Sequence, residues 1–278
     1  MSLGIAFKGP EGIVLAADSR VTLTVQQGPP GSQQVMPAYF DNATKLLTFT
    51  SQPYIGAVTY GLGAIGTTEP RTAHSFLTEF ETSIAGRPRM KVGELARHLS
   101  DFFLARFNGV MPSPWSGVDL VFLVGGYDEG EDYGRLYEIK IPGVPAPVEQ
   151  QASTFGITWG GQTEATARLL NGFDGQLITV AQSALNLQPA QVTQLHDALR
   201  QNMGAKIPYQ FLPLQDCVDL SIFLIRATAE LQSWQVGIRG VGGAIDVATI
   251  TRTDGLREIQ RKQIVGEGGL SGRTVIRR

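Results

Sequence analysis

Ser2 and Asp18, near the start of the chain, are of types that could carry nucleophilic and acid–base chemistry. Residues 2–20 read as two apolar segments joined by Gly-Pro-Glu-Gly at residues 9–12, which predicts a β-hairpin. If this turn is centred on its middle peptide, the numbers of paired residues sum to about 21. The start of the first strand then lies beside Asp18 and Arg20, so we expect an acid next to the beginning of the chain.

Ser2 could supply both a hydroxyl and an amine. Met1 precedes a small residue, the context in which an initiator methionine is usually removed, and its removal would leave Ser2 with a free α-amino group. Because the unperturbed pKa of an α-amino group is about 7.7–8.0, this amine can act near neutral pH as a base for its own hydroxyl. The spacing alone favours a merely structural alternative, in which Asp18 and Arg20 form a salt bridge at the end of a strand and Lys45 is a surface charge.

Gly61 begins a glycine-rich stretch, residues 61–66, that follows the apolar run 54–60. The stretch leads into Thr-Thr-Glu-Pro and not directly into a helix, so it does not support a nucleotide-binding loop. Two interpretations stay open: a plain turn that leaves a sheet, or a place where the backbone approaches a substrate closely.

Four segments resemble those of proteasome β-type subunits, which are N-terminal nucleophile hydrolases with bacterial relatives. Residues 6–22, AFKGPEGIVLAADSRVT, are similar to the family's opening hairpin, and the spacing matches Ser2 to the nucleophile and Asp18 to the acid. Asn-Ala-Thr-Lys-Leu-Leu resembles the segment with the active-site lysine, which makes Lys45 its match. Gly-Ala-Val-Thr-Tyr-Gly matches Gly61 to the oxyanion donor, and residues 242–255 resemble the last hairpin.

The resemblance implies a four-layer αββα sandwich, the N-terminal nucleophile hydrolase fold, and cleavage of peptide or amide bonds without a metal or organic cofactor. In that mechanism Ser2 Oγ attacks the carbonyl, the Ser2 amine carries the proton, and the Gly61 N–H stabilises the oxyanion. Lys45 lowers the pKa of the hydroxyl, and Asp18 balances Lys45. The resemblance also implies a ring-like homo-oligomer; whether an ATPase partner exists stays open.

Departures from the family pattern keep two other functions open. Ser2 stands where the family has Thr, and the residues that support the amino terminus in the family fall on Gly160 and Ile238. These two positions favour a catalytically silent assembly subunit. An insertion at about 174–215 could close the cleft, which would suit a small-molecule amidase instead.

The composition sets the class of protein. The chain has 278 residues, 42% hydrophobic and 17% charged, which is ample material for a core. A net charge of −2 and short basic runs only argue against nucleic-acid binding. The single cysteine, Cys217, excludes an intramolecular disulfide and suggests the cytoplasm, and we interpret it as a small buried side chain. Neither a leader nor an apolar run of membrane-spanning length is found, so no membrane association is expected.

Hydrophobic periodicity predicts a single α+β domain over residues 1–278, with a tail from about 265 to 278. Residues 21–37, rich in Gln, Gly and Pro, are interpreted as a mobile loop. The predicted helices cover residues 72–84, 92–107, 161–173 and 216–231, with a further helical signal after Pro189; the predicted strands after the first hairpin cover 45–50, 54–60, 118–125, 135–141, 244–251 and 256–260.

Overall fold

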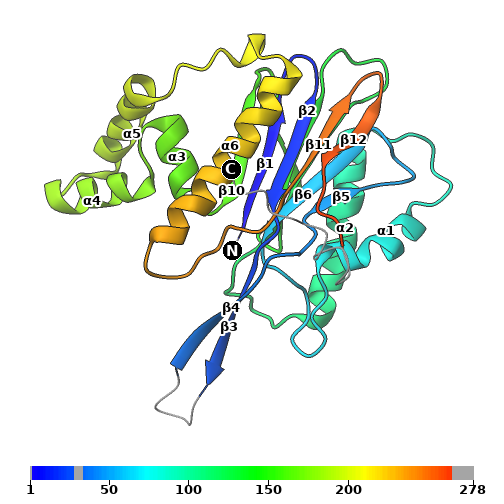
Figure 1. Cartoon of the computed structure of the whole chain (residues 1–278), viewed down its shortest axis with the longest axis horizontal. Helices are drawn as coiled ribbons and strands as arrows, with labels where there is room; N and C mark the ends of the chain where they lie inside the picture. The colour runs from blue at the N-terminus through cyan, green and yellow to red at the C-terminus, as the bar shows by residue number, and fades with distance from the viewer. Residues whose placement is uncertain (1, 28–33, 265–278) are drawn as a thin grey trace, which may run out of the picture.

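Among the described residues, two five-stranded sheets and a projecting two-stranded ribbon form the β part of the molecule (Figure 1). The structure is a computed structural model that describes residues 2–27 and 34–264. The predicted tail at about 265–278 therefore lies outside the described residues.

The first sheet contains the first and the last described strands and has the strand order β10-β1-β2-β11-β12. Its neighbouring strands all pair antiparallel. Gly4 pairs with Ala17, so the pair numbers in the first hairpin sum to 21, which confirms the predicted register. The strands are β1 (Leu3–Lys8), β2 (Ile13–Asp18), β10 (Gly156–Gly161), β11 (Ile245–Thr251) and β12 (Gly255–Gln260).

The second sheet is a meander with the order β5-β6-β7-β8-β9. Each strand pairs antiparallel with the one that follows it in the chain. The strands are β5 (Leu46–Thr48), β6 (Ile55–Gly61), β7 (Leu120–Gly126), β8 (Arg135–Ile141) and β9 (Val144–Gln150). Strand β7 is buried along its whole length, as its continuous apolar sequence predicts.

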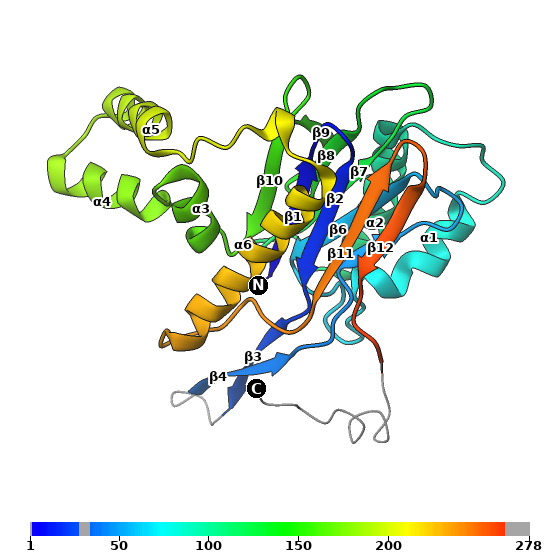
Figure 2. The ribbon, with the colours of Figure 1, turned by 45° about the horizontal axis from the view of Figure 1, so that its top comes forward.

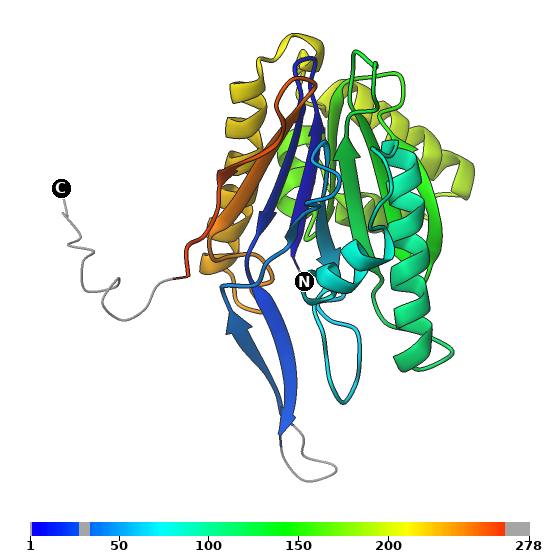
Figure 3. The ribbon, with the colours of Figure 1, turned by 90° about the vertical axis from the view of Figure 1, so that its right-hand side faces the viewer.

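The two sheets stack face to face, and helices cover both outer faces, which makes a four-layer αββα sandwich (Figure 3). Helices α1 (Leu77–Ser83) and α2 (Val92–Val110), after the short turn η1 (Ala73–Phe76), pack on the second sheet. Helix α6 (Leu214–Trp234), with α3 (Glu164–Asn171) beside it, packs on the first. Cys217 lies in this last core, and burial raises the pKa of its thiol to about 11.

The expected mobile loop at residues 21–37 is largely strand. Strand β3 (Val21–Gln27) pairs along its length with β4 (Gln34–Phe40), and this ribbon projects from one end of the sandwich (Figure 3). The prediction was wrong here because the Val-Thr-Leu-Thr-Val alternation that begins β3 is itself a strand signal. The part of the predicted loop at residues 28–33, which holds most of the Gly and Pro, lies outside the described residues.

The other differences concern residues 144–203. Strands β9 and β10 were not predicted, and because β10 ends at Gly161, helix α3 begins at Glu164 and not at residue 161. The insertion holds two helices, α4 (Gly175–Leu185) and α5 (Pro189–Met203), followed by the short turn η2 (Tyr209–Phe211). Neither α4 nor α5 has a fully buried residue, and both extend outward beside α3 (Figure 2).

None of the helices described in the structure combines the length and the apolarity that crossing a membrane would require.

The Tyr60 ring packs where β1 and β10 meet the second sheet. A Cβ atom built on Gly160 would lie 2.2 Å from the ring's Cζ, and one on Gly4 would lie 2.8 Å from its Cδ1. These two paired glycines therefore leave the space that the ring fills.

We expect Gly160→Ala to lower the free energy of unfolding by about 1–3 kcal/mol, because the new methyl group must displace the Tyr60 ring. The matched control is Gly109→Ala in α2, where a Cβ meets nothing within 4 Å. That change should be neutral or stabilising by up to about 1 kcal/mol. Chemical denaturation of both variants measures the difference; equal stabilities would contradict the packing described.

Candidate active site

The carboxylate of Asp18, at the end of β2, is fully buried. Its Oδ1 accepts a hydrogen bond from the Leu3 N–H at 3.0 Å, and its Oδ2 accepts from the N–H groups of Arg20 at 3.1 Å and Gly242 at 3.0 Å. One side chain thus ties the first residue of β1 to the segment that enters β11. The predicted position of Asp18 beside the start of the chain is confirmed.

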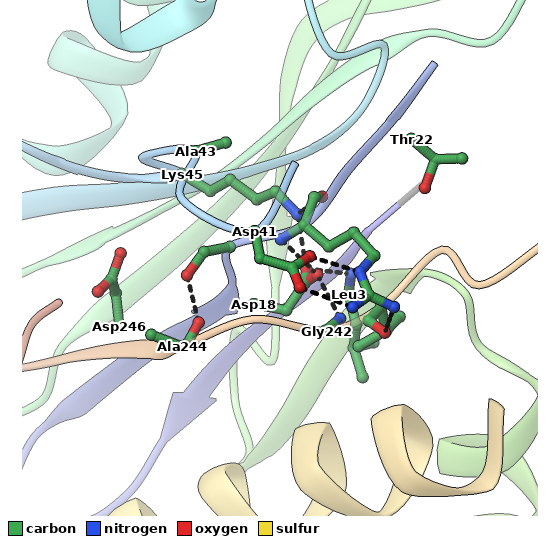
Figure 4. A network of polar contacts seen from close by, with 12 residues as sticks. Leu3, Asp18, Thr22, Asp41, Ala43, Lys45, Gly242, Ala244 and Asp246 are labelled. Atoms are coloured by element: carbon green, nitrogen blue, oxygen red, sulfur yellow. Dashed lines mark hydrogen bonds and ion pairs between the residues drawn. The ribbon is translucent and has the colours of Figure 1, made fainter. Parts of the chain in front are cut away.

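Lys45 lies just before β5 and completes the hydrogen bonds of this carboxylate (Figure 4). Its Nζ donates to Asp18 Oδ1 at 2.7 Å and to the carbonyl oxygen of Arg20 at 2.6 Å. Only 7% of the Lys45 side chain is exposed, so burial lowers its pKa, while the Asp18 carboxylate opposes that shift. The alternative that Lys45 is a plain surface charge is therefore wrong.

Arg20 does not bridge to Asp18 through its side chain. Its guanidinium binds Asp41 with two hydrogen bonds, from Nε at 2.6 Å and from Nη2 at 2.8 Å, and this contact holds the pKa of Asp41 below its usual range. A Cβ atom on Gly242 would lie 2.4 Å from the guanidinium carbon, so the glycine lets Arg20 lie against the backbone. The Arg20–Asp41 pair is thus an outer support of the Asp18 and Lys45 site.

Ser2 lies directly before β1 and is buried. Its carbonyl oxygen accepts a hydrogen bond from the Gln162 N–H at 2.8 Å. Gly161 has a φ of 100°, and a Cβ atom there would meet the Ser2 carbonyl at 1.9 Å, so glycine is required for this close contact. The position of Ser2 is therefore set by β10 on one side and, through Leu3, by Asp18 on the other.

Ser2, Lys45 and Gly61 line the same cleft, which has a volume of about 550 Å³. Apart from Lys45, none of the described residues around it carries a charge at neutral pH. Its other walls are mostly apolar and come from the base of the ribbon, the end of β6 and the approach to β7, including Val21, Leu23, Leu62, Ala64, Val118 and Leu120. Among the described residues, no group of three His, Cys, Asp or Glu side chains is arranged to hold a metal ion.

The N–H of Gly61 points away from β7. The neighbouring Leu62 N–H is hydrogen-bonded to the Asp119 carbonyl at 2.9 Å, and such bonds alternate along antiparallel strands. The Gly61–Leu120 pair is therefore of the non-bonded type, and the Gly61 N–H faces the side where β5 begins only at Leu46. Gly61 has a φ of 84°, and a Cβ atom there would meet the Asp119 carbonyl at 2.1 Å.

The two positions that depart from the family pattern have different surroundings. Gly160 lies on β10 opposite Gly4, and the Tyr60 ring occupies the place of any side chain there. Ile238 lies between α6 and β11, is 44% exposed and does not line the cleft. Gln162, directly after β10, donates its backbone N–H to Ser2, and its side-chain oxygen accepts a hydrogen bond from Gln232 at 3.2 Å.

Sequence reasoning missed several supporting groups. The Arg20–Asp41 pair, the Gly242 N–H and a second buried pair, Lys262 with Asp246, all surround the site. A usable signal was present for the second pair, because Asp246 interrupts an apolar strand just as Asp18 ends one. No local pattern indicates Asp41, whose partner lies 21 residues away on another element.

No protein-family model matches this chain, and no curated protein matches it in sequence. A solved structure does: the Anbu (Gly-1) mutant from Hyphomicrobium sp. strain MC1 superposes with a TM-score of 0.54. The two sequences are 16% identical over 96% of this chain and 88% of that chain. Anbu is a bacterial proteasome-like protein with an N-terminal nucleophile hydrolase fold, so the likeness shows that fold for this chain.

Removal of the Asp18 charge should destabilise the protein, because it leaves the Lys45 ammonium buried without its partner. We expect Asp18→Asn to lower the free energy of unfolding by about 3–5 kcal/mol. The double variant Asp18→Asn/Lys45→Met should recover part of this loss. Asp132→Asn, at an exposed acid paired with Arg252, is the matched control and should change stability by less than about 0.5 kcal/mol.

Urea denaturation at neutral pH measures all four proteins. An Asp18→Asn variant as stable as the control would contradict the buried pair.

Proposed function

We propose that this protein is an N-terminal nucleophile hydrolase that cleaves peptide or amide bonds, with Ser2 as the nucleophile. One observation carries the proposal: Ser2, Lys45 and the Gly61 backbone line a single cleft, and Lys45 is held there by the fully buried Asp18. Burial of an ammonium in a substrate-sized cleft costs free energy of folding, which favours a chemical role for Lys45.

The reaction would proceed in two halves. After removal of Met1, Ser2 Oγ attacks the carbonyl carbon, and the Ser2 amine takes the hydroxyl proton and passes it to the leaving amine. The C–N bond breaks and an ester to Ser2 remains. Water then attacks this ester with the same amine as base, which releases the acid and restores the hydroxyl. In both halves the Gly61 N–H and the Lys45 ammonium stabilise negative charge on oxygen.

The shape and lining of the cleft support a peptide as substrate. The cleft runs between the base of the ribbon and the end of β6, and its walls are mostly apolar. No residue of the insertion at about 174–215 lines it, so the insertion does not supply the closed cleft that would have favoured a small-molecule amidase. Residues 21–23 at the base of the ribbon line the cleft instead.

A catalytically silent assembly subunit is the second candidate function. It is favoured by Gly160 and Ile238, neither of which offers a hydrogen-bonding side chain to Ser2. Both candidates keep the homo-oligomer that the family resemblance implies. Exposed apolar side chains on α6, including Phe223 and Trp234, support such self-association.

Ser2 gives the first test of the enzyme. N-terminal sequencing should show that the mature chain begins at Ser2, and Ser2→Ala should lose peptidase activity by at least about 10³-fold because the attacking oxygen is gone. Ser2→Thr keeps the hydroxyl and the amine, so it is the matched control and should remain active. Activity retained by Ser2→Ala, or Met1 found on essentially all chains of an active preparation, would contradict the mechanism.

Lys45 gives the second test. Lys45→Ala should lower kcat/KM on the order of 10²-fold, by analogy with the loss of one oxyanion donor. Lys45→Arg should fail nearly as badly, because a planar guanidinium does not fit between Asp18 Oδ1 and the Arg20 carbonyl as an ammonium does. Lys140→Ala removes an exposed ammonium and should have no effect. Parent-like activity in both Lys45 variants would place the site elsewhere.

A further inference from the structure

Lys262, just after β12, forms a second buried ion pair close to the first. Its Nζ lies 2.5 Å from Asp246 Oδ2 and 2.8 Å from the carbonyl oxygen of Ala43, to which it donates a hydrogen bond. Its backbone N–H donates to Asp246 Oδ1 at 2.9 Å. The side chains of Lys262 and Asp246 are only 10% and 2% exposed. Such burial makes either charge costly to leave without its partner.

The contact with Ala43 links this pair to the cleft. Residues 41–45 connect the ribbon to β5, and Ala43 and Lys45 both line the cleft. The Ala43 N–H donates to the Ser19 carbonyl at 2.9 Å, so the segment is held on one side by the strand end that carries Asp18. Lys262 holds the same residue through its carbonyl oxygen.

We propose that Lys262 and Asp246 form a positioning pair, which clamps residues 41–45 against the first sheet and places a second ammonium near Lys45. Neither residue lines the cleft, so the pair acts through residues 41–45 and Lys45. The catalytic consequence rests on the proposed function, whereas the clamp itself can be measured without activity.

The charges around Lys45 and Lys262 determine how the clamp affects the pKa of Lys45. Asp18, Arg20, Asp41 and Lys262 act on Lys45. Asp246 pairs with Lys262 and also attracts Arg261, and both of these cations act on His74. Lys262 and Arg20 add to the lowering of the Lys45 pKa by like-charge repulsion, after the larger effect of burial.

Single substitutions in the pair should therefore move the Lys45 pKa in opposite directions. Lys262→Met removes a cation and leaves the Asp246 anion, so the pKa of Lys45 should rise. Asp246→Asn leaves the Lys262 cation unbalanced, so the pKa of Lys45 should fall. A merely structural role would not produce opposite shifts.

The pH dependence of kcat/KM reports these shifts if Lys45 must stay protonated. The alkaline limb should move to higher pH in Lys262→Met and to lower pH in Asp246→Asn, and Lys262→Arg should keep the parent limb because it keeps the cation. Loosening of residues 41–45 in Lys262→Met should also cost about tenfold at the pH optimum, less than the roughly 10²-fold expected for a 1 Å displacement. Arg257→Met, which removes an exposed cation of β12 that pairs with Asp254, is the matched control and should behave as the parent.

Titration of ¹³C-labelled lysine side chains by NMR in the same proteins separates this inference from the proposed function. If no substrate is hydrolysed but the Lys45 midpoint moves up in Lys262→Met and down in Asp246→Asn, the clamp stands and the hydrolase proposal fails. If the parent is active but the Lys45 midpoint is unchanged in both variants, or moves the same way in both, the clamp is overturned and the hydrolase proposal is untouched.

Discussion

The buried ion pair between Asp18 and Lys45 is the contact on which the rest of the site depends. Its carboxylate accepts from backbone N–H groups at the start of β1, at Arg20 just beyond β2 and at the entry to β11. Its ammonium partner comes from just before β5 in the other sheet. Because a buried carboxylate with these donors has one satisfied arrangement, the position of Ser2 beside the cleft follows from it. The first sheet thus contributes Ser2 and Asp18, the second contributes Lys45, and the ion pair holds the two sheets together at the site.

Such a pair is poor evidence for stability by itself, since its desolvation can cost as much as its attraction returns. This protein nevertheless places three cations near one another, Lys45, Arg20 and Lys262, each with its own acid. The arrangement compensates each charge locally while it keeps an ammonium in a mostly apolar cleft. Fixed, locally compensated charges beside an apolar cleft are typical of sites that use electrostatic preorganisation for catalysis.

Much of this frame could be predicted from the sequence, because its signals are local. The hairpin register, the buried strand β7 and the helices α2 and α6 follow from turn residues and periodicity over one segment. Strand β10 and the Arg20–Asp41 pair could not be predicted as readily, because each depends on a partner on another element of the chain. The ribbon β3–β4 was missed for a different reason, since the alternation in β3 is a local signal that the composition of residues 21–37 obscured. Gly160 shows the limit most clearly. A glycine is needed there because the Tyr60 ring fills the adjacent space, and the ring reaches it only in the folded sandwich.

A crystal structure of the protein after treatment with a β-lactone, which acylates a nucleophilic hydroxyl to an ester, would test the central claim most directly. The account predicts continuous density from Ser2 Oγ to the acyl group, no residue before Ser2, and the ester carbonyl oxygen within hydrogen-bonding distance of the Gly61 N–H. An acyl group on another side chain, with Ser2 unmodified in the same crystal, would contradict it.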